Sequence, residues 1–215
     1  IKGLSGTQAR NIASQGASAT TLSKLVECAT DKNLSLAASA DPTTSVDPGL
    51  NAQVATIWGI NANNKTTGNY LTASIVFNAL NGRAVAGMID RGGYDYHGAG
   101  RVSQNQSDLT AGQLIGNALE TAAAVGRKAV IHITSDGAVS ADSNSGFGAS
   151  YSNDAGQHGG SFVLFYDPAG TATVKNDAFN YQIGSLNNGQ GNANSVITSV
   201  ERAAAAVFAN WAQFG

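Results

Sequence analysis

Three short apolar runs constrain the fold of this chain more than any other feature. They cover residues 84–89, 128–134 and 161–166, and each has the length of a single buried strand. Largely apolar strands are typical of parallel sheets, because helices cover both faces of such sheets. Helical patterns follow two of the runs, over 108–125 and 195–214. We therefore predict an α/β fold, a layered and mostly parallel sheet with helices on both faces.

The chain before the first run has a different pattern. Residues 50–60 and 70–80 carry apolar side chains at helical spacing, whereas 40–49 contains two prolines and predicts a loop. We expect two regions as a result. Residues 1–83 form a mainly helical amino-terminal region, and residues 84–215 form an α/β core with metal-site-like loops and a carboxyl-terminal helix.

The helices of the second region carry their own boundary signals. Asp108 is expected to cap the helix that follows the first run, and Gly126 is expected to end it. In the terminal helix, one apolar set is expected to face inward: Val196, Val200, Ala203, Val207, Phe208 and Trp211.

Charge and composition exclude some classes of function. Charged residues make up 12% of the chain, and 12 Lys and Arg against 14 Asp and Glu give a net charge of −2. Phosphate-backbone binding needs a concentrated cationic surface, so we expect no nucleic-acid partner. No apolar run approaches the roughly 20 residues that cross a bilayer, so we expect no membrane span. The 26 glycines and the scarcity of charge favour a periplasmic or extracellular protein.

Acidic and imidazole side chains stand beside all three apolar runs. Asp95 and His97 follow the first run, Asp136 follows the second, and Asp154 and His158 precede the third. Ligands in open α/β sheets collect beyond the carboxyl ends of the strands. Carboxylate and imidazole together are ligands that zinc, iron and manganese accept. The pattern therefore predicts a metal site.

Each of these candidates has a simpler interpretation. A single Asp-x-His pair such as Asp95 and His97 is common by chance. Asp136 would equally well cap a turn, and Asp154 and His158 would equally well belong to a solvated loop. Spacing alone leaves both interpretations open.

Four further residues carry expectations of the same kind. Arg91 and Arg101 flank the first candidate loop, where they would either bind an anion or simply lie on the surface. His132 has apolar neighbours, which favours a hydrogen-bonded core histidine. Cys28, the only cysteine, is expected to be a small core residue and has no partner in the chain for a disulfide.

The order of the motifs resembles the carboxyl-terminal half of an uncharacterised bacterial family of the alkaline phosphatase/sulfatase superfamily, usually exported by the twin-arginine route. That family has Gly-Gly-Trp-Asp-Thr-His, then Ser-Glu-Phe-Gly-Arg, a Gly-x-Asp-His-Gly loop, and Thr-Ser-Val-Asp before the last helix. The matching residues here are Gly92, Gly93, Tyr94, Asp95 and His97; Ser135, Asp136 and Gly137; Asp154, His158, Gly159 and Gly160; and Thr198, Ser199, Val200 and Glu201.

The resemblance implies an alkaline-phosphatase-like fold, here a partial domain, and a metal-dependent hydrolase of phosphate or sulfate esters. It implies a divalent metal, either zinc, iron, manganese or calcium. The implied metal ligands are Asp95, His97, Asp136 and His158, and the implied catalytic residues are Arg91 and Asp154.

The family's nucleophile has no counterpart in this chain. Superfamily enzymes carry a metal aspartate and a nucleophilic Ser or Thr after an earlier strand, and no such unit precedes residue 84. Together with the start at Ile1, this predicts a missing amino-terminal half, a second chain that supplies it, or lost catalysis. The alternative function is a non-catalytic secreted structural or binding subunit that keeps the fold without turnover, and the partner expected for it is a further copy of the chain, by self-assembly.

Overall fold

The computed structural model describes residues 46–94, 101–135, 138–139, 154–155, 161–170 and 199–214, together with residues 24, 26–28, 30–31, 34–35 and 38. For Arg101, Val200 and the residues 138–139 and 154–155, only the backbone is described.

Four elements form a helical group in the first half of the chain. They are the 3-10 helix η1 (Pro48–Leu50) and the α-helices α3 (Ala52–Trp58), α4 (Gly68–Leu80) and α5 (Arg101–Ala124). Side-chain caps define their starts: Asp47 accepts a hydrogen bond from the N–H of Gly49, and Asn51 accepts from the N–H groups at the start of α3. Gly59, in the left-handed region at φ 61°, ends α3. The helices expected over 50–60 and 70–80 are thus confirmed.

The core of this group is small and aromatic. Val54 and Trp58 of α3 pack with Ala73 and Phe77 of α4, and all four are buried. Leu114, Ala124 and Val125 pack against them from α5 and the residue after it. The indole N–H of Trp58 donates to the hydroxyl of Thr121 over 2.8 Å, inside the core. A hydrogen bond at that depth satisfies the only polar atom of the indole and fixes α3 against α5.

The second half of the described chain is built on a two-stranded ladder. Strand β1 (Ala129–Thr134) pairs antiparallel with β4 (Ser161–Tyr166), from Ala129 opposite Tyr166 to Thr134 opposite Ser161. A short second ladder joins β2 (Ala138–Val139) to β3 (Asp154–Ala155), also antiparallel. The last element is helix α6 (Val200–Phe214).

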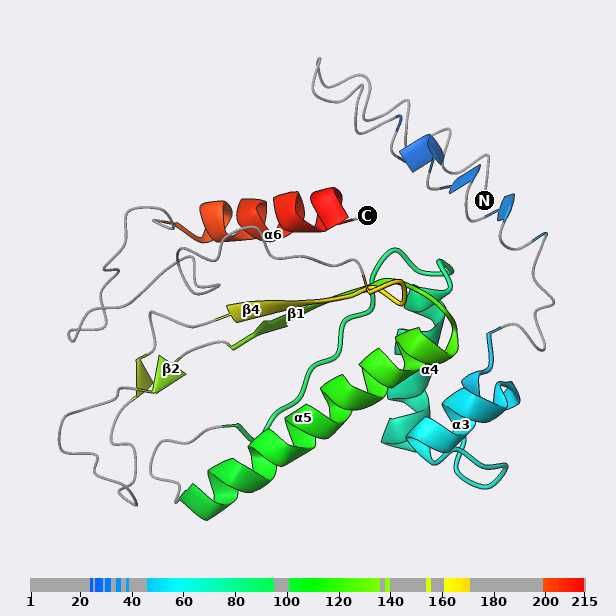
Figure 1. Ribbon diagram of the computed structural model, residues 1–215, viewed down its shortest axis with the longest axis horizontal. Helices are drawn as coiled ribbons and strands as arrows, with labels where there is room; N and C mark the ends of the chain where they lie inside the picture. The colour runs from blue at the N-terminus through cyan, green and yellow to red at the C-terminus, as the bar shows by residue number, and fades with distance from the viewer. Residues whose placement is uncertain are drawn as a thin grey trace.

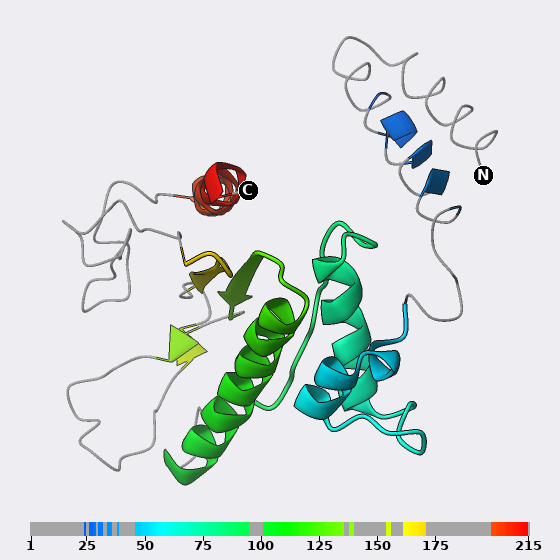
Figure 2. The ribbon, with the colours of Figure 1, turned by 45° about the vertical axis from the view of Figure 1, so that its right-hand side comes forward.

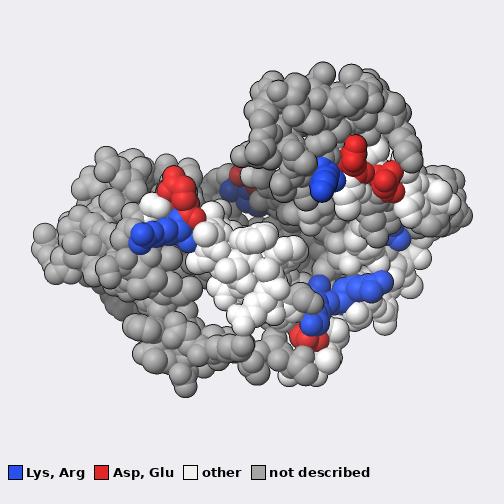
Figure 3. All heavy atoms as spheres, turned by 90° about the horizontal axis from the view of Figure 1, so that it is seen from above, with Lys and Arg blue, Asp and Glu red and all other residues white. Residues whose placement is uncertain are grey.

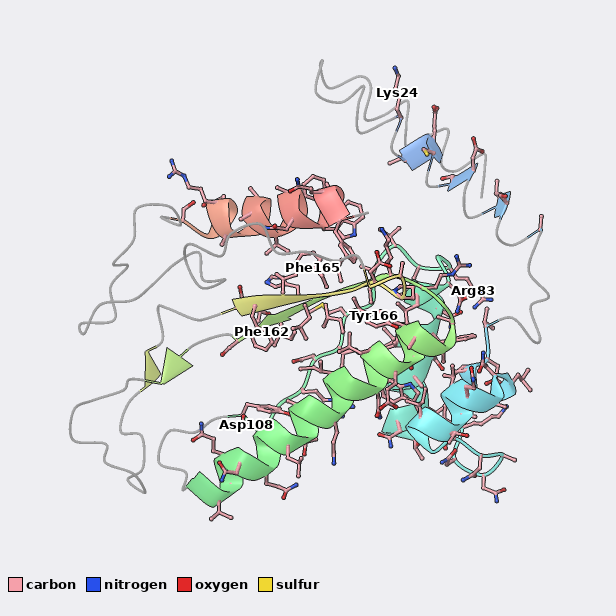
Figure 4. The ribbon with its side chains drawn as sticks, in the orientation of Figure 1. Lys24, Arg83, Asp108, Phe162, Phe165 and Tyr166 are labelled. Atoms are coloured by element: carbon pink, nitrogen blue, oxygen red, sulfur yellow. The ribbon has the colours of Figure 1, made fainter. Side chains whose placement is uncertain are left out.

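The β1–β4 ladder lies between two helices. Figures 1 and 2 show α6 on one side of it and α5 on the other. Successive residues of β4 alternate between the two faces: Phe165 lies on the α6 side, and Phe162 and Tyr166 lie on the α5 side (Figure 4).

The predicted sheet is wrong in its strand direction. Within the described residues the strands form two two-stranded antiparallel ladders, so a layered, mostly parallel sheet of the alkaline-phosphatase type is contradicted. A parallel pair needs a crossover of a dozen or more residues, usually a helix. The chain between Thr134 and Ser161 instead includes β2 and β3, which pair with each other and return the chain antiparallel.

The predicted first strand is also wrong. Residues 84–89 form no strand, and Val85 and Met88 are almost fully exposed. The segment passes close to α4, since a Cβ on Gly87 would stand 2.5 Å from Cγ2 of Ile75. Apolar character alone therefore misled here, because an apolar run becomes a strand only when a neighbouring strand pairs with it.

Helix α5 differs from expectation at its start and agrees at its end. It begins at Arg101, so Asp108 lies in its second turn and is not its N-cap. It ends as predicted at Gly126, which has φ 63° and donates to the carbonyl of Ala123. Glycine is favoured there because it adopts positive φ without a steric cost.

In the described part of the chain, no helix has both the length and the apolarity that crossing a membrane requires.

Candidate functional site

The four predicted metal ligands, Asp95, His97, Asp136 and His158, lie outside the described residues. Among the residues that are described, no group of three or more His, Cys, Asp or Glu side chains is arranged to hold a metal ion. The ligand set therefore stays a prediction.

The two predicted catalytic residues are described in part. Asp154 belongs to β3, where its backbone is paired with Val139, and its side chain lies outside the description. Arg91 donates from its guanidinium to the hydroxyl of Thr72 on α4, over 3.2 Å. That contact ties the extended segment after residue 84 to α4, and it accounts for one of the five N–H donors of the arginine.

Described residues on both sides of positions 136 and 158 are paired with each other in the two ladders. Thr134 pairs with Ser161, and Ala138 pairs with Ala155. In the sequence, Asp136 falls between Thr134 and Ala138, and His158 falls between Ala155 and Ser161. The chain positions of both residues are therefore flanked on each side by paired residues.

Two of the simpler predictions are wrong. His132 is exposed rather than buried in a core, because it lies on the α6 face of β1, opposite Val163, where little covers it. Cys28 is exposed as well. Apolar neighbours in the sequence did not bury either side chain, since burial depends on what packs on that face of the element.

The best-defined charged cluster is centred on Asp47, which is mostly buried. Its carboxylate pairs with the ammonium of Lys65 and accepts hydrogen bonds from the N–H of Gly49 over 2.8 Å and the hydroxyl of Tyr70 over 3.2 Å. The hydrogen bond from Lys65 is the main reason that the pKa of Asp47 is lowered. The same contact raises the pKa of Lys65. This cluster links η1 to α4, and the carboxylate of Asp47 is occupied by its contacts with Lys65, Gly49 and Tyr70.

A second cluster holds the end of α6 against the sheet. The ring of Phe214 lies 5.0 Å from that of Phe165 and 5.1 Å from the ammonium of Lys128. The same ammonium donates to the carbonyl of Phe214 over 3.3 Å and stands 3.5 Å from the buried carboxylate of Asp167. A cation is favoured at this position because the carboxyl end of a helix carries partial negative charge.

The outward face of α6 is the largest departure from the sequence prediction. Phe208 and Trp211, which were expected to face inward, are 65% and 51% exposed. Their rings contact each other in a tilted arrangement, with 5.6 Å between centroids. The helical spacing of 3.6 residues per turn places Phe208 about 100° round the helix from Val207, whereas Trp211 lies one turn after Val207, at the edge of the partly buried row that Ala203 and Val207 form. In the sequence, only the position of Phe208 directly after Val207 indicates that it lies on another side of the helix.

Comparison with known proteins adds no relative to this description. No protein-family model, no curated protein and no solved structure matches the chain.

Proposed function

We propose that this protein is a non-catalytic, secreted structural or binding subunit, which acts by associating with another protein chain outside the cytoplasm. The observation that carries the proposal is the exposed aromatic pair, Phe208 and Trp211, on a helix whose last residue, Phe214, already packs against Phe165 of the sheet. Large apolar side chains gathered on one exposed face are typical of interaction surfaces.

The described charges support a structural role. Asp47 is held by Lys65, Gly49 and Tyr70, and Asp167 is buried beside Lys128. Catalytic carboxylates have to reach a substrate. These two instead join elements of the fold.

Sedimentation of the purified protein over a concentration series tests the proposal. We expect a species heavier than the 21.8 kDa monomer at high concentration. The double variant Phe208→Ser/Trp211→Ser should shift the equilibrium to the monomer. A matched control, Val102→Ser on α5, changes a side chain that is 84% exposed and should leave the equilibrium unchanged. A wild-type protein that stays monomeric at every concentration contradicts the proposal.

A metal-dependent hydrolase of phosphate or sulfate esters is the second candidate. What favours it is the pairing of Thr134 with Ser161 and of Ala138 with Ala155. Each Cα lies about 3.8 Å from the next, so only two or three residues of chain separate Asp136 and His158 from paired positions. Two ligands of one cation lie within a few ångströms of each other, so this candidate requires the side chains of Asp136 and His158 to meet.

In this candidate the metal would be held by Asp136 and His158 with Asp95 and His97. When bound, the ion would neutralise the anionic ester and lower the pKa of a coordinated water. Arg91 would bind ester oxygens, and Asp154 would orient a ligand.

Metal analysis of the purified protein and assays with p-nitrophenyl phosphate and p-nitrophenyl sulfate separate the two candidates. The hydrolase requires stoichiometric zinc, iron, manganese or calcium and turnover that His158→Ala abolishes. The subunit proposal expects neither, and stoichiometric metal with turnover would overturn it.

A further inference from the structure

We infer that the partner of α6 is a second copy of the same helix, packed antiparallel about a two-fold axis at Phe208. This inference rests on the proposed function and names the occupant of its surface.

The outward stripe of α6 is uncharged along most of its length. Phe208 and Trp211 form its centre, and the exposed alanines Ala204, Ala205 and Ala212 lie beside them at helical spacing. The helix's described charged side chains, Glu201 and Arg202, both belong to its first turn. Figure 3 looks down on this surface and shows an uncharged run with charge gathered at one end.

The order of large and small side chains is self-complementary. A two-fold axis at Phe208 pairs residues that are equally far from it along the helix. Trp211 then lies opposite Ala205 of the partner subunit, and Ala204 lies opposite Ala212 of the partner subunit. A large side chain opposite a small one allows two helices to pack closely, and the two Phe208 rings meet at the axis.

The charges favour the antiparallel arrangement over the parallel one. A parallel pair would place Glu201 beside Glu201 and Arg202 beside Arg202, at the same end. The antiparallel pair places each charged first turn beside a carboxyl-terminal turn that has no charged residue. It also sets the two helix dipoles head to tail, which is the attractive orientation.

The size of the stripe limits the strength of the pair. A helix of 15 residues is about 22 Å long, so a stripe about 10 Å wide buries on the order of 200 Å² per subunit. Stable interfaces bury about 800 Å² per partner. We therefore expect a weak dimer that forms at hundreds of micromolar and dissociates on dilution.

Cysteine cross-linking in the full chain tests the register, in a Cys28→Ser background that removes the native thiol. Under mild oxidation Phe208→Cys should form a disulfide-linked dimer, because position 208 meets itself at the axis. Ala204→Cys and Ala212→Cys should each stay monomeric alone and should cross-link when mixed. Their self-pairs would be about 12 Å apart along the axis, beyond the roughly 7 Å limit for a disulfide. Ala209→Cys, exposed but off the stripe, is the matched control and should not cross-link.

The outcomes separate this inference from the proposed function. A protein that self-associates in sedimentation without the 204–212 cross-link overturns the inference and leaves the proposed function standing. Cross-linking of Ala204→Cys with itself indicates parallel helices and overturns it too. A protein that stays monomeric at about 2 mM, above the expected dissociation range, overturns both.

Discussion

The helical group and the sheet with α6 use aromatic side chains in opposite ways. In the helical group, Trp58 is 3% exposed, and its indole N–H has a partner in Thr121. In the second region, Trp211 is 51% exposed, and its ring contacts that of Phe208, three residues earlier in the helix. One tryptophan closes a core, and the other lies on a surface.

This difference in aromatic burial shows that the two regions are stabilised in different ways. Helices α3, α4 and α5 cover one another, so their group has a core of its own. A two-stranded ladder is at best marginally stable without a covering layer. The β1–β4 ladder therefore depends on helices on its two faces, and α6 is held there through Phe214 and Lys128.

The largest expected effect on the free energy of unfolding comes from replacing one of the two tryptophans, and the other serves as its control. Trp58→Ala should lower the free energy of unfolding by about 3–5 kcal/mol, because it opens a cavity and leaves Thr121 without its donor. Trp211→Ala is the matched control and should cost less than about 1 kcal/mol. Urea unfolding followed by circular dichroism measures both. Equal losses would show that the two regions do not differ as described.

The next effect concerns the attachment of α6. Phe214→Ala removes the ring pair with Phe165 and the contact with Lys128, which together are worth about 1–2 kcal/mol. Hydrogen exchange should become faster in α6 while α3 and α4 keep their protection. Faster exchange in α3 and α4 to the same degree would mean that the two regions unfold as one.

Replacing two glycines in and after α5 by alanine should change the free energy of unfolding in opposite directions. Gly126→Ala places a Cβ at φ 63° and should destabilise by about 1 kcal/mol. Gly116→Ala lies inside the helix, with no atom within 4 Å of the new Cβ, and should stabilise by about 0.5–1 kcal/mol. Thermal unfolding of the two variants checks the signs, and a stabilising Gly126→Ala would contradict the C-cap.

The smallest effect is electrostatic and depends on pH. The pKa of Asp47 is lowered in the folded protein, so its contribution is complete above the unfolded pKa of about 3.9 and is lost as the pH falls through the folded value. Asp47→Asn keeps an acceptor for Gly49 but loses the charge, and should cost less than about 1 kcal/mol at pH 7. The difference from wild type should shrink below pH 4 in urea titrations. A difference that is constant down to pH 2 would exclude the ion pair as its source.

Local signals in the sequence predicted the helices well and the sheet poorly. The spacing of Val54 and Trp58 and the glycine at 126 act within a few residues, so α3 and the end of α5 follow from them. The start of α5 was missed because Asp108 resembles a cap but the polar residues before it continue the helix. Strand direction was missed because it depends on pairing over about 30 residues, which no local pattern encodes.

The sequence predicted the candidate functional surface only in part as well. Apolar periodicity placed Phe208 and Trp211 inside, because apolar character marks a broad face of the helix but does not show how much of that face a neighbouring element covers. The cluster around Asp47 was missed altogether. Lys65 and Tyr70 are 18 and 23 residues from Asp47 in the chain, and only folding brings them together.

The amino-acid sequence by itself determined where the helices of the first region form, where the chain turns, and which segments are apolar enough to become strands. These are short-range properties, set by side-chain spacing, caps and backbone preferences. Only the tertiary structure decided that β1 and β4 run antiparallel and that residues 84–89 stay unpaired in the described chain. It also decided that Phe214 meets Phe165 and that Phe208 and Trp211 stay exposed, because burial depends on which other element lies against each side of a helix.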